Sequence, residues 1–486
     1  MAKNVLALSA IALTSLLAVG CNSQTGATLP QGSSLQALGT SGVAASYIVS
    51  SARALPADFR NTVARNGDQL VSVDEAAGFA NVVTKNPSAY GRFADIVVRD
   101  LTLQWIPSEN DAKFKTVALD ETAALTATNP NTNTRYPLLW GLQAVHAPQA
   151  WAAGVRGKDA TGRKVRVAVL DSGIFKSHPD IAPNLNTELS TSFVSGQTYY
   201  DMQGTTFNHG THVAGTIAAA DNNIGVIGVA PDAEIVAVKV LSAKTGSGSF
   251  AGIIAGITYA ADIDADVINM SLGATLPRRS YIDDNGTPND TSDDVRVSAN
   301  EITAITTALS RATTYAYNKG TTIIASEGND AIDKDKSADI ISVPADSAHV
   351  LSISATSPEG WGQDPTTNLD VLTSYSNFGA SAVNFAAPGG DSRLPGEAPC
   401  TVGGLTRPCW VFDMVLSTNV NGGYTWAAGT SMAAPHASGI AALIIGQSGG
   451  RMNPAAVASE LAKRASDLGK PGNDPAYGGG RVSSGF

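Results

Sequence analysis

Three short segments of the sequence each place a reactive side chain among glycines and other small residues. Asp171 follows the apolar run 165–170, His209 stands in Asn-His-Gly-Thr-His, and Ser431 stands in Gly-Thr-Ser-Met-Ala. A serine hydroxyl becomes a nucleophile when a histidine takes its proton and an acid behind that histidine fixes the tautomer. Taken singly, each residue has an ordinary structural role, as a strand-end acid or a helix cap. Together they are the set that acyl transfer requires.

A fourth residue, Asn329, follows the apolar run 321–325 in the segment Ser-Glu-Gly-Asn. Its amide can donate a hydrogen bond to a developing oxyanion, and its structural alternative is a turn residue. Ser431 opens an apolar helical segment, so backbone NH groups and the positive end of the helix dipole lie beside its hydroxyl. The sequence therefore places an oxyanion-binding recess beside the nucleophile.

The elements that must position these residues alternate between apolar strands and helices from residue 140 onward. This order predicts an α/β, doubly wound parallel sheet with functional residues beyond the carboxyl ends of the strands. The predicted strands are 164–170, 234–241, 266–270, 321–325 and 350–355. The predicted helices are 209–219, 250–262, 301–319, 431–446 and 454–464.

A smaller unit precedes this domain. Residues 47–105 read as strand, helix, two strands, helix and strand, the order of a small ferredoxin-like α+β domain. Its predicted helices are 55–65 and 87–93, and its last strand is 94–105. Residues 106–138 are rich in Asn, Asp, Pro and Thr and are interpreted as a linker that a protease can cut.

The N-terminus is typical of an exported protein. Lys3 precedes an apolar stretch at 5–19 and Cys21, so residues 1–21 are interpreted as a signal peptide. The segment Leu-Ala-Val-Gly-Cys also resembles a bacterial lipoprotein signal, in which Cys21 would be lipidated, and plain cleavage is the alternative. Residues 22–46 are rich in Ser, Thr, Gly and Ala and are predicted to be a flexible tether.

Cysteine use and charge narrow the functional classes. The chain has three cysteines, and Cys400 and Cys409 are predicted to form a disulfide bond, with free thiols as the alternative. A formal charge of −10 offers no basic face for phosphates, which excludes nucleic acid as the working partner.

Two insertions, 274–299 and 389–411, are predicted to be surface loops. The acidic run 283–294 either binds calcium or is a solvated loop, and its spacing favours the loop.

The three motifs together resemble a known family. Val-Ala-Val-Leu-Asp-Ser-Gly-Ile, His-Gly-Thr-His-Val-Ala-Gly-Thr and Gly-Thr-Ser-Met-Ala-Ala-Pro-His are similar to the signature blocks of the subtilisin-like serine proteases, in that family's Asp, His, Ser order. The resemblance covers about residues 140–482. It implies a peptidase domain over 139–486 and an inhibitory, folding-assisting propeptide over 47–105.

The same resemblance implies a role for each site residue. Asp171 would orient the base, His209 would act as general base and then acid, and Ser431 would attack the peptide carbonyl. Asn329 and the backbone NH of Ser431 would hold the oxyanion. Substrate would bind between a pocket wall, an edge that pairs with its backbone, and a more distant apolar pocket at Phe250. The wall residues are Ser271, Leu272, Gly273 and Gly328. The edge residues are Gly246, Ser247 and Gly248. Strand-end packing is the alternative role for these positions.

A structural calcium site is also implied by the resemblance. Asp180 and Asn222 match side-chain ligands of the family, and the carbonyls of Ala220, Ile224 and Val226 would complete the set. The chain departs from the pattern near residue 136, where the family can offer an amide side chain and this chain has Tyr136.

These observations predict a secreted serine endopeptidase, made as a precursor that processes itself between 106 and 138. We expect protein and peptide substrates, broad specificity with a preference for large apolar residues, the propeptide as intramolecular inhibitor, and a monomer. A membrane would be contacted only through lipidated Cys21. A serine esterase is the first alternative, but it requires Gly-x-Ser-x-Gly, and Ser431 lies in Gly-x-Ser-x-Ala. A non-catalytic binding protein with the same fold is the second.

Overall fold

The computed structural model describes most of the chain from residue 43 onward. The predicted signal peptide, Cys21 and most of the predicted tether lie outside the described residues. Two short parts of the tether are strands instead, because β1 (Leu35–Gln36) and the start of β2 (Ala45–Ser50) belong to a sheet. The described residues are 35–36, 43–107, 114–119, 133–202, 204–283, 291–292 and 294–486.

A five-stranded sheet forms the N-terminal domain. Its strand order is β1–β5–β2–β4–β3, and its strands from β5 to β3 pair antiparallel. The bounds are β2 (Ala45–Ser50), β3 (Gln69–Asp74), β4 (Phe79–Thr84), β5 (Ile96–Arg99) and helix α1 (Phe59–Arg65).

The second predicted helix and the last predicted strand of this domain are both wrong in detail. The helix expected at 87–93 is a single 3-10 turn, η1 (Pro87–Tyr90), which ends at Gly91. The strand expected at 94–105 is broken, because β5 stays in the small sheet whereas β6 (Thr102–Gln104) pairs with another strand, β11 (Ser247–Ser249). The break falls at Asp100, whose carboxylate accepts a hydrogen bond from the backbone NH of Ala251.

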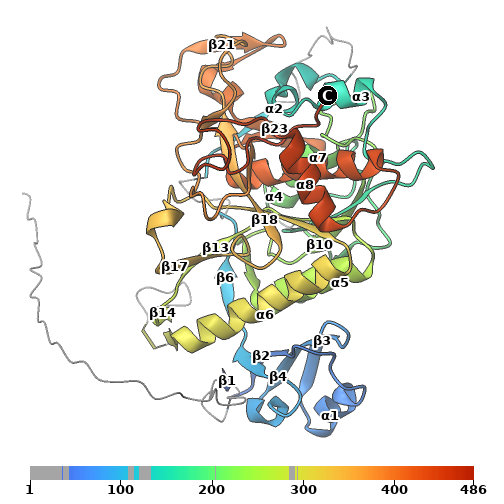
Figure 1. Cartoon of the computed structure of the whole chain (residues 1–486), viewed down its shortest axis with the longest axis vertical. Coiled ribbons are helices and arrows are strands. Elements are labelled where there is room, and N and C mark those ends of the chain that lie inside the picture. Colours follow the sequence, from blue (N-terminus) through green and yellow to red (C-terminus); the bar gives the residue numbers. More distant parts are fainter. Residues whose placement is uncertain are drawn as a thin grey trace, which may run out of the picture. The chain divides into compact units, whose positions relative to one another are not determined.

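A larger, mainly parallel sheet forms the second domain (Figure 1). Its order is β19–β18–β16–β12–β8–β10–β9, with β20 also beside β18, and every pairing is parallel except β18 with β19. The bounds are β8 (Arg166–Asp171), β9 (Thr191–Ser192), β10 (Glu234–Lys239), β12 (Val267–Met270), β16 (Thr322–Ser326), β18 (Val350–Ser357), β19 (Val371–Leu372) and β20 (Phe385–Pro388).

Helices cover both faces of this sheet. Val167 and Val169 of β8 pack into one core with α4 (His209–Ala218) and α7 (Thr430–Gln447). Ala168 and Leu170 point the other way, into a second core with α5 (Phe250–Asp262) and α6 (Ala299–Asn318), as expected when successive side chains of a strand face opposite sides. Shorter helices are α2 (Trp140–Ala144), α3 (Ala147–Ala152) and α8 (Pro454–Arg464). The predicted doubly wound sheet is confirmed.

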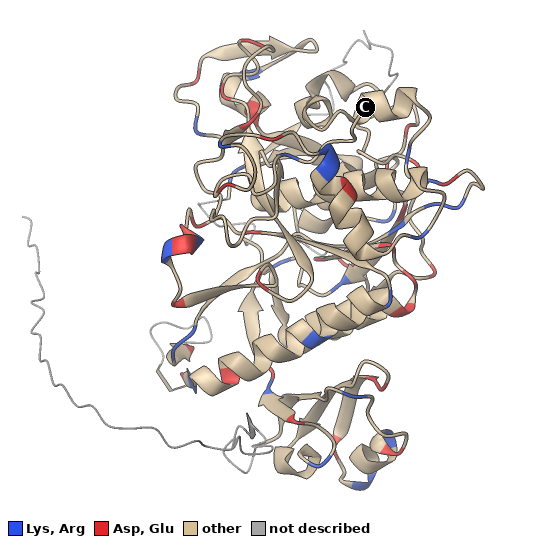
Figure 2. Cartoon of the chain, in the orientation of Figure 1, with Lys and Arg blue, Asp and Glu red and all other residues tan. Residues whose placement is uncertain are grey.

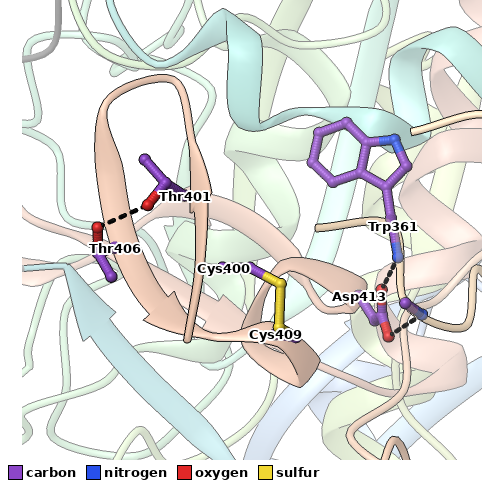
Figure 3. The surroundings of a disulfide bond; sticks show 7 residues. Trp361, Cys400, Thr401, Thr406, Cys409 and Asp413 are labelled. Atoms are coloured by element: carbon purple, nitrogen blue, oxygen red, sulfur yellow. Dashed lines mark hydrogen bonds between the residues drawn. A yellow bond between two sulfur atoms is a disulfide. The ribbon is translucent and has the colours of Figure 1, made fainter. Parts of the chain in front are cut away.

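The two insertions contain strands that the sequence did not predict. In the first insertion, β13 (Ala274–Pro277) pairs antiparallel with β17 (Ile340–Val343) from outside it, and β14 (Tyr281–Asp283) pairs with β15 (Val295–Val297). In the second insertion, β21 (Pro399–Val402) pairs with β22 (Leu405–Pro408). A further sheet joins β23 (Val415–Thr418), β24 (Tyr424–Ala427) and β7 (Thr116–Leu119), so part of the predicted linker is a strand. The structure joins Cys400 to Cys409 in a disulfide bond at the base of the β21–β22 hairpin (Figure 3).

Charged residues are dispersed over the described chain, and Lys and Arg do not gather on one element (Figure 2). None of the helices in the described ranges is long and apolar enough to span a membrane.

Candidate active site

The four predicted catalytic residues lie on elements that end or begin at one edge of the large sheet. Asp171 is the last residue of β8, and His209 is the first residue of α4. Ser431 is the second residue of α7, and Asn329 follows the end of β16 by three residues. Residues 38 to 260 positions apart in the chain are thereby brought to one site, as the strand-end argument predicted.

Asp171 and His209 form a direct buried pair. His209 Nδ1 lies 2.9 Å from Asp171 Oδ2 and 3.0 Å from Oδ1. The Asp171 side chain is fully buried, and that of His209 is 4% exposed. With Nδ1 donating to the carboxylate, Nε2 carries the free lone pair, and Nε2 has no hydrogen-bond partner among the described residues. The imidazole is therefore held in the tautomer of a general base.

A shell around Ser172 fixes this pair in place. Ser172 Oγ accepts hydrogen bonds from Asn208 Nδ2 at 3.0 Å and from the Gly210 backbone NH at 3.2 Å, on either side of His209. Asn208 also caps α4, since its side chain accepts from Thr211 N. The start of α4 is thus tied to the end of β8.

A buried lysine that sequence reasoning missed completes this shell. Lys239 is paired in register with Asp171, is fully buried, and donates from Nζ to Ser172 O at 2.5 Å. Burial lowers the pKa of Lys239 to about 8, and the charges of Asp201 and Asp171 oppose that shift. A single lysine inside the apolar run Ile-Val-Ala-Val-Lys-Val-Leu was the signal that could have found it.

The nucleophile half of the site is arranged differently. Ser431 Oγ donates to Ser271 O at 3.1 Å, so the structure does not join the hydroxyl to His209 Nε2. Asn329 Oδ1 accepts from Thr430 N at 2.9 Å and from Thr430 Oγ1 at 2.8 Å, which leaves its NH₂ group directed away from Thr430. A Cβ placed on Gly429 would lie 3.6 Å from Ser431 N and 3.7 Å from Asn329 Nδ2, so the two predicted oxyanion donors converge beside Gly429.

Glu327 is a carboxylate near these donors that was not predicted from the sequence. Glu327 is 1% exposed, and neither of its oxygens has a hydrogen-bond partner among the described residues. Burial raises the pKa of Glu327 to about 7, with Asp346 adding to the shift and Lys334 opposing it. The nearby hydroxyl of Ser352 is donated to Ala382 O and so does not satisfy the carboxylate.

The chain's own residues 103–107 line the cleft that contains Ser431. The cleft has a volume of about 610 Å³ and is lined by Trp105, Leu276, Asn329 and Ser431 among others. Trp105 accepts at its carbonyl from Gly273 N at 2.9 Å and donates from its backbone NH to Gly246 O at 3.0 Å. Its indole donates to Gly248 O at 2.8 Å and packs edge-on against Phe250, with ring centroids 4.8 Å apart.

The predicted substrate-binding residues are therefore in contact with an extended peptide segment. Gly246, Ser247 and Gly248 pair with residues 103–105, and Leu272 packs in the same core as Trp105. Gly328 instead donates its backbone NH to Thr430 Oγ1 at 3.2 Å and has φ +116°, a conformation that favours glycine.

A second segment, residues 114–119, also reaches this cleft, which Phe114 and Lys115 line together with residues 103–107. Strand β7 pairs antiparallel with β24, which leads into Ser431 through Gly429. The Phe114 ring lies 5.6 Å from that of Phe207 and 6.4 Å from the imidazole of His209.

The predicted calcium ligands lie together around Asp180. Asp180 accepts from Asn222 Nδ2 at 3.1 Å, from Val226 N at 3.0 Å and from Tyr424 Oη at 2.9 Å. A Cβ on Gly225 would come within 2.0 Å of Asp180 Oδ2, so only glycine fits this turn. Burial raises the pKa of Asp180 to about 6.

A buried amide lies beside this cluster, three residues before Tyr136. Asn133 is fully buried, and its Nδ2 donates to Ala220 O at 3.1 Å and to Val226 O at 2.9 Å. The sequence could not place Asn133, because it follows a segment without periodicity.

Three other histidines are buried and hydrogen-bonded to backbone carbonyls. Burial lowers the pKa of His178 to about 4, of His212 to about 3 and of His436 to about 4, so each is neutral at pH 7. Their partners are Gly423 O, Val415 O with Thr425 O, and Met432 O. These contacts give all three histidines structural roles.

Comparison with known proteins identifies the family. Residues 162–480 match the Subtilase family. The chain belongs to the subtilase family. It is 32% identical over 311 residues to the Major intracellular serine protease of Bacillus subtilis, covering 63% of this chain and 74% of that protein. Thermitase of Thermoactinomyces vulgaris is 30% identical over 334 residues, covering 68% of this chain and 90% of thermitase.

Solved structures support the same fold. The epidermin leader peptide processing serine protease of Staphylococcus aureus has a TM-score of 0.65 at 21% identity and covers 91% of this chain and 97% of its own. A lanthipeptide protease has a TM-score of 0.54 at 26% identity, covering 72% and 92%. This subtilase is a serine-type endopeptidase that acts on proteins and peptides.

Proposed function

We propose that this subtilase is a secreted endopeptidase that works through Asp171, His209 and Ser431 and is made as a precursor that cuts itself. The observation that carries the proposal is the buried Asp171–His209 pair, together with a cleft that Ser431 and Asn329 share with the chain's own residues 103–107, Phe114 and Lys115.

The reaction needs one movement of the nucleophile. Rotation about the Cα–Cβ bond of Ser431 exchanges its hydrogen bond to Ser271 O for one to His209 Nε2, which has no other described partner. Ser431 Oγ then bonds to the peptide carbonyl carbon while its proton passes to Nε2, and Asp171 stabilises the resulting imidazolium. The oxyanion accepts from Asn329 Nδ2 and Ser431 N.

The second half of the reaction returns the enzyme to its starting state. The C–N bond breaks as Nε2 gives its proton to the leaving amine, which leaves an acyl-enzyme on Ser431. A water then attacks the ester, again with His209 as base, and the carboxylic acid product leaves.

Self-processing is supported by the way the precursor contacts its own cleft. Trp105 is hydrogen-bonded on both sides, to Gly246 and Gly273, as an extended substrate backbone would be. The second segment meets the chain again near His209, where the Phe114 ring lies 6.4 Å from the imidazole and β7 pairs with β24. A cut between residues 107 and 114 falls within the predicted linker 106–138.

Residues 47–105 act in this proposal as a ferredoxin-like inhibitory propeptide. The strand order β5–β2–β4–β3 with helix α1 between β2 and β3 supports that assignment. Asp100 braces the contact by accepting from Ala251 N in the first turn of α5, where the helix dipole favours a carboxylate.

Secretion is supported by the sequence at 1–21 and by the Cys400–Cys409 pair. Lipidation at Cys21 would anchor the enzyme to the cell envelope, and mass spectrometry of the exported N-terminus tests it.

The enzyme prefers large apolar residues before the cut bond in this proposal, and Asp330 also admits basic residues there. Peptide anilides varied at that position test this preference. Fastest turnover of small residues would reject it.

A structural calcium ion fits the cluster around Asp180. Asn133 directs an amide NH₂ group at two predicted carbonyl ligands, so these oxygens converge where a cation would be attracted, and turning that amide places its oxygen there instead. Asp180, Asn222 and Asn133 with the carbonyls of Ala220, Ile224 and Val226 would hold the ion. When bound, it would brace the loop that follows α4, the helix that carries His209.

Hydrolysis of casein and of tributyrin in parallel tests the proposal against its two alternatives. We expect casein hydrolysis that a serine-directed organophosphate abolishes, with little turnover of tributyrin. Preferred turnover of tributyrin would indicate an esterase, and inactivity on both a binding protein. N-terminal sequencing of Ser431→Ala, made in a host without other proteases, tests self-processing, since a mature N-terminus in that variant would contradict it.

A further inference from the structure

The disulfide-closed insertion holds an aromatic ring beside the catalytic cleft. Trp410 directly follows Cys409 in the 3-10 helix η4 (Cys409–Asp413). Asp413 anchors the end of this turn, because its carboxylate accepts from Gly360 N and Trp361 N, both at 2.8 Å (Figure 3). The disulfide and these two bonds hold both ends of the turn. Trp410 is thus presented on a rigid base.

A lysine of the chain's own segment lies over this ring. Lys115 Nζ is 3.4 Å from the centroid of Trp410, within the range of a cation–π contact. Lys115 is exposed and has no ion-pair partner among the carboxylates of the described residues, so the ring is the group that its ammonium meets.

The residues around Lys115 run along β24 in extended form. Thr116 is in register with Ala427, and Leu119 with Tyr424, so four residues add a strand to the β23–β24 sheet. On the other side of Lys115, Phe114 contacts the ring of Phe207. The segment therefore makes two side-chain contacts through adjacent residues, Phe114 near His209 and Lys115 on Trp410, followed by main-chain pairing along β24.

We propose that Trp410, Phe207 and the edge of β24 form a binding site for the substrate residues that follow the scissile bond, selecting an aromatic residue followed by lysine or arginine. The inference rests on the proposed function, because a precursor that cuts itself presents residues 114–119 as its first substrate. Strand addition supplies affinity that is independent of sequence, and the two aromatic side chains supply selection.

The physical basis for selection is the difference between a cation and a neutral chain over Trp410. A norleucine in place of Lys115 keeps the methylene chain but removes the charge, so only the cation–π energy is lost. The β24 hydrogen bonds are shared by all sequences and do not discriminate. Preference for a cation must therefore depend on the ring of Trp410.

Synthetic peptides of residues 101–119 with lysine, norleucine or glutamate at position 115 test the site. The kcat/KM of each is measured with the processed wild-type enzyme and with Trp410→Leu and Trp410→Phe. For the wild type we expect lysine to be preferred over norleucine by roughly 3- to 10-fold, and glutamate to be cut most slowly. The ratio falls to about 1 in Trp410→Leu and lies between in Trp410→Phe.

Taking a ratio of two substrates in one enzyme removes effects of a variant on folding or on overall activity. Any competition from the enzyme's own residues 114–119 affects the two peptides equally. A wild-type ratio of 1, or an equal ratio in Trp410→Leu, overturns the inference and limits the Lys115–Trp410 contact to the precursor. If no peptide is cut by the wild type, the proposed function itself fails.

Discussion

The two halves of the catalytic centre differ in how firmly the fold holds them. The acid–base half has a buried carboxylate and imidazole in direct contact, with Ser172 tying the start of α4 to the end of β8. In the nucleophile half, Ser431 Oγ is bonded to Ser271 O and has to turn before it meets His209. In the proposed mechanism, the comparison means that the base is positioned before substrate arrives, whereas the nucleophile needs one side-chain rotation.

The largest effect is expected in the nucleophile half. Asn329→Ala removes a donor to the oxyanion but leaves the Asp171–His209 pair intact, so kcat should fall about 100- to 1000-fold, the loss known for the corresponding donor of subtilisin. KM should change little. Because Asn329 Oδ1 also accepts from Thr430 N and Thr430 Oγ1, the unfolding free energy should fall as well, by about 1 to 3 kcal/mol. Kinetics with a peptide anilide and calorimetry measure the two effects, and Asn473→Ala, an exposed asparagine on another loop, is the control. A variant that loses stability but keeps the wild-type kcat would contradict the role of Asn329 in binding the oxyanion.

The next effect concerns stability in the same half and depends on pH. Because the pKa of Glu327 is raised to about 7, its contribution to stability is fully present below its unfolded value near 4.5 and is lost as pH rises through 7. Glu327→Gln should therefore be more stable than the wild type at pH 8, by at most about 3 kcal/mol, with little gain at pH 4.5. Urea unfolding at both pH values measures it. A gain that is larger at pH 4.5 would show that the carboxylate is not the cause.

Calcium removal tests whether a bound ion stabilises the loop that follows α4, the helix that carries His209. Chelation should lower the melting temperature at pH 7.5, by an amount equivalent to about 2 to 3 kcal/mol when calcium is at 100 times its Kd. Since the pKa of Asp180 is raised to about 6, protons compete with the ion at pH 5, and the shift should be smaller there. Asp180→Asn should show a much weaker response to calcium. Equal calcium shifts at both pH values would argue against this site.

The smallest effect is expected from the shell behind the base. Ser172→Ala leaves two buried donors, Asn208 Nδ2 and Gly210 N, without their acceptor, which should cost about 1 to 3 kcal/mol of unfolding free energy. Ser172→Thr, which keeps the hydroxyl, is the matched control. Calorimetry of both variants checks this. A Ser172→Ala protein as stable as the wild type would show that the hydrogen bonds to Ser172 Oγ do not stabilise the fold.

The positions of the main strands and helices could be predicted because they depend on local apolar patterns. Helix α5 runs from Phe250 to Asp262 as expected, and the strand ends at Asp171 and Ser326 lie within one residue of the prediction. Strand-end topology then brought the four predicted residues to one edge, although it could not give the rotamer of Ser431.

What could not be predicted depends on contacts between distant segments. Lys239, Glu327 and Trp410 gain their roles from neighbours far away in the chain, and Asn133 meets Ala220 and Val226 only after folding. The strands β7, β21 and β22 have four residues each, which is too short for their pattern to be distinguished from a loop. Within 94–105, the charged pair Arg99–Asp100 lies at the break, but the sequence does not show that the parts before and after it pair with different strands.

The reactivity of Ser431 toward an organofluorophosphate tests most directly whether its hydroxyl joins His209. Mass spectrometry of the labelled, processed enzyme gives both the modified residue and the rate of its modification. A single adduct on Ser431 is predicted, formed rapidly in the wild type and at a rate near that of free serine in His209→Ala. Labelling of Ser431 at equal rates in both proteins would contradict the account, because the hydroxyl would then be reacting without the imidazole.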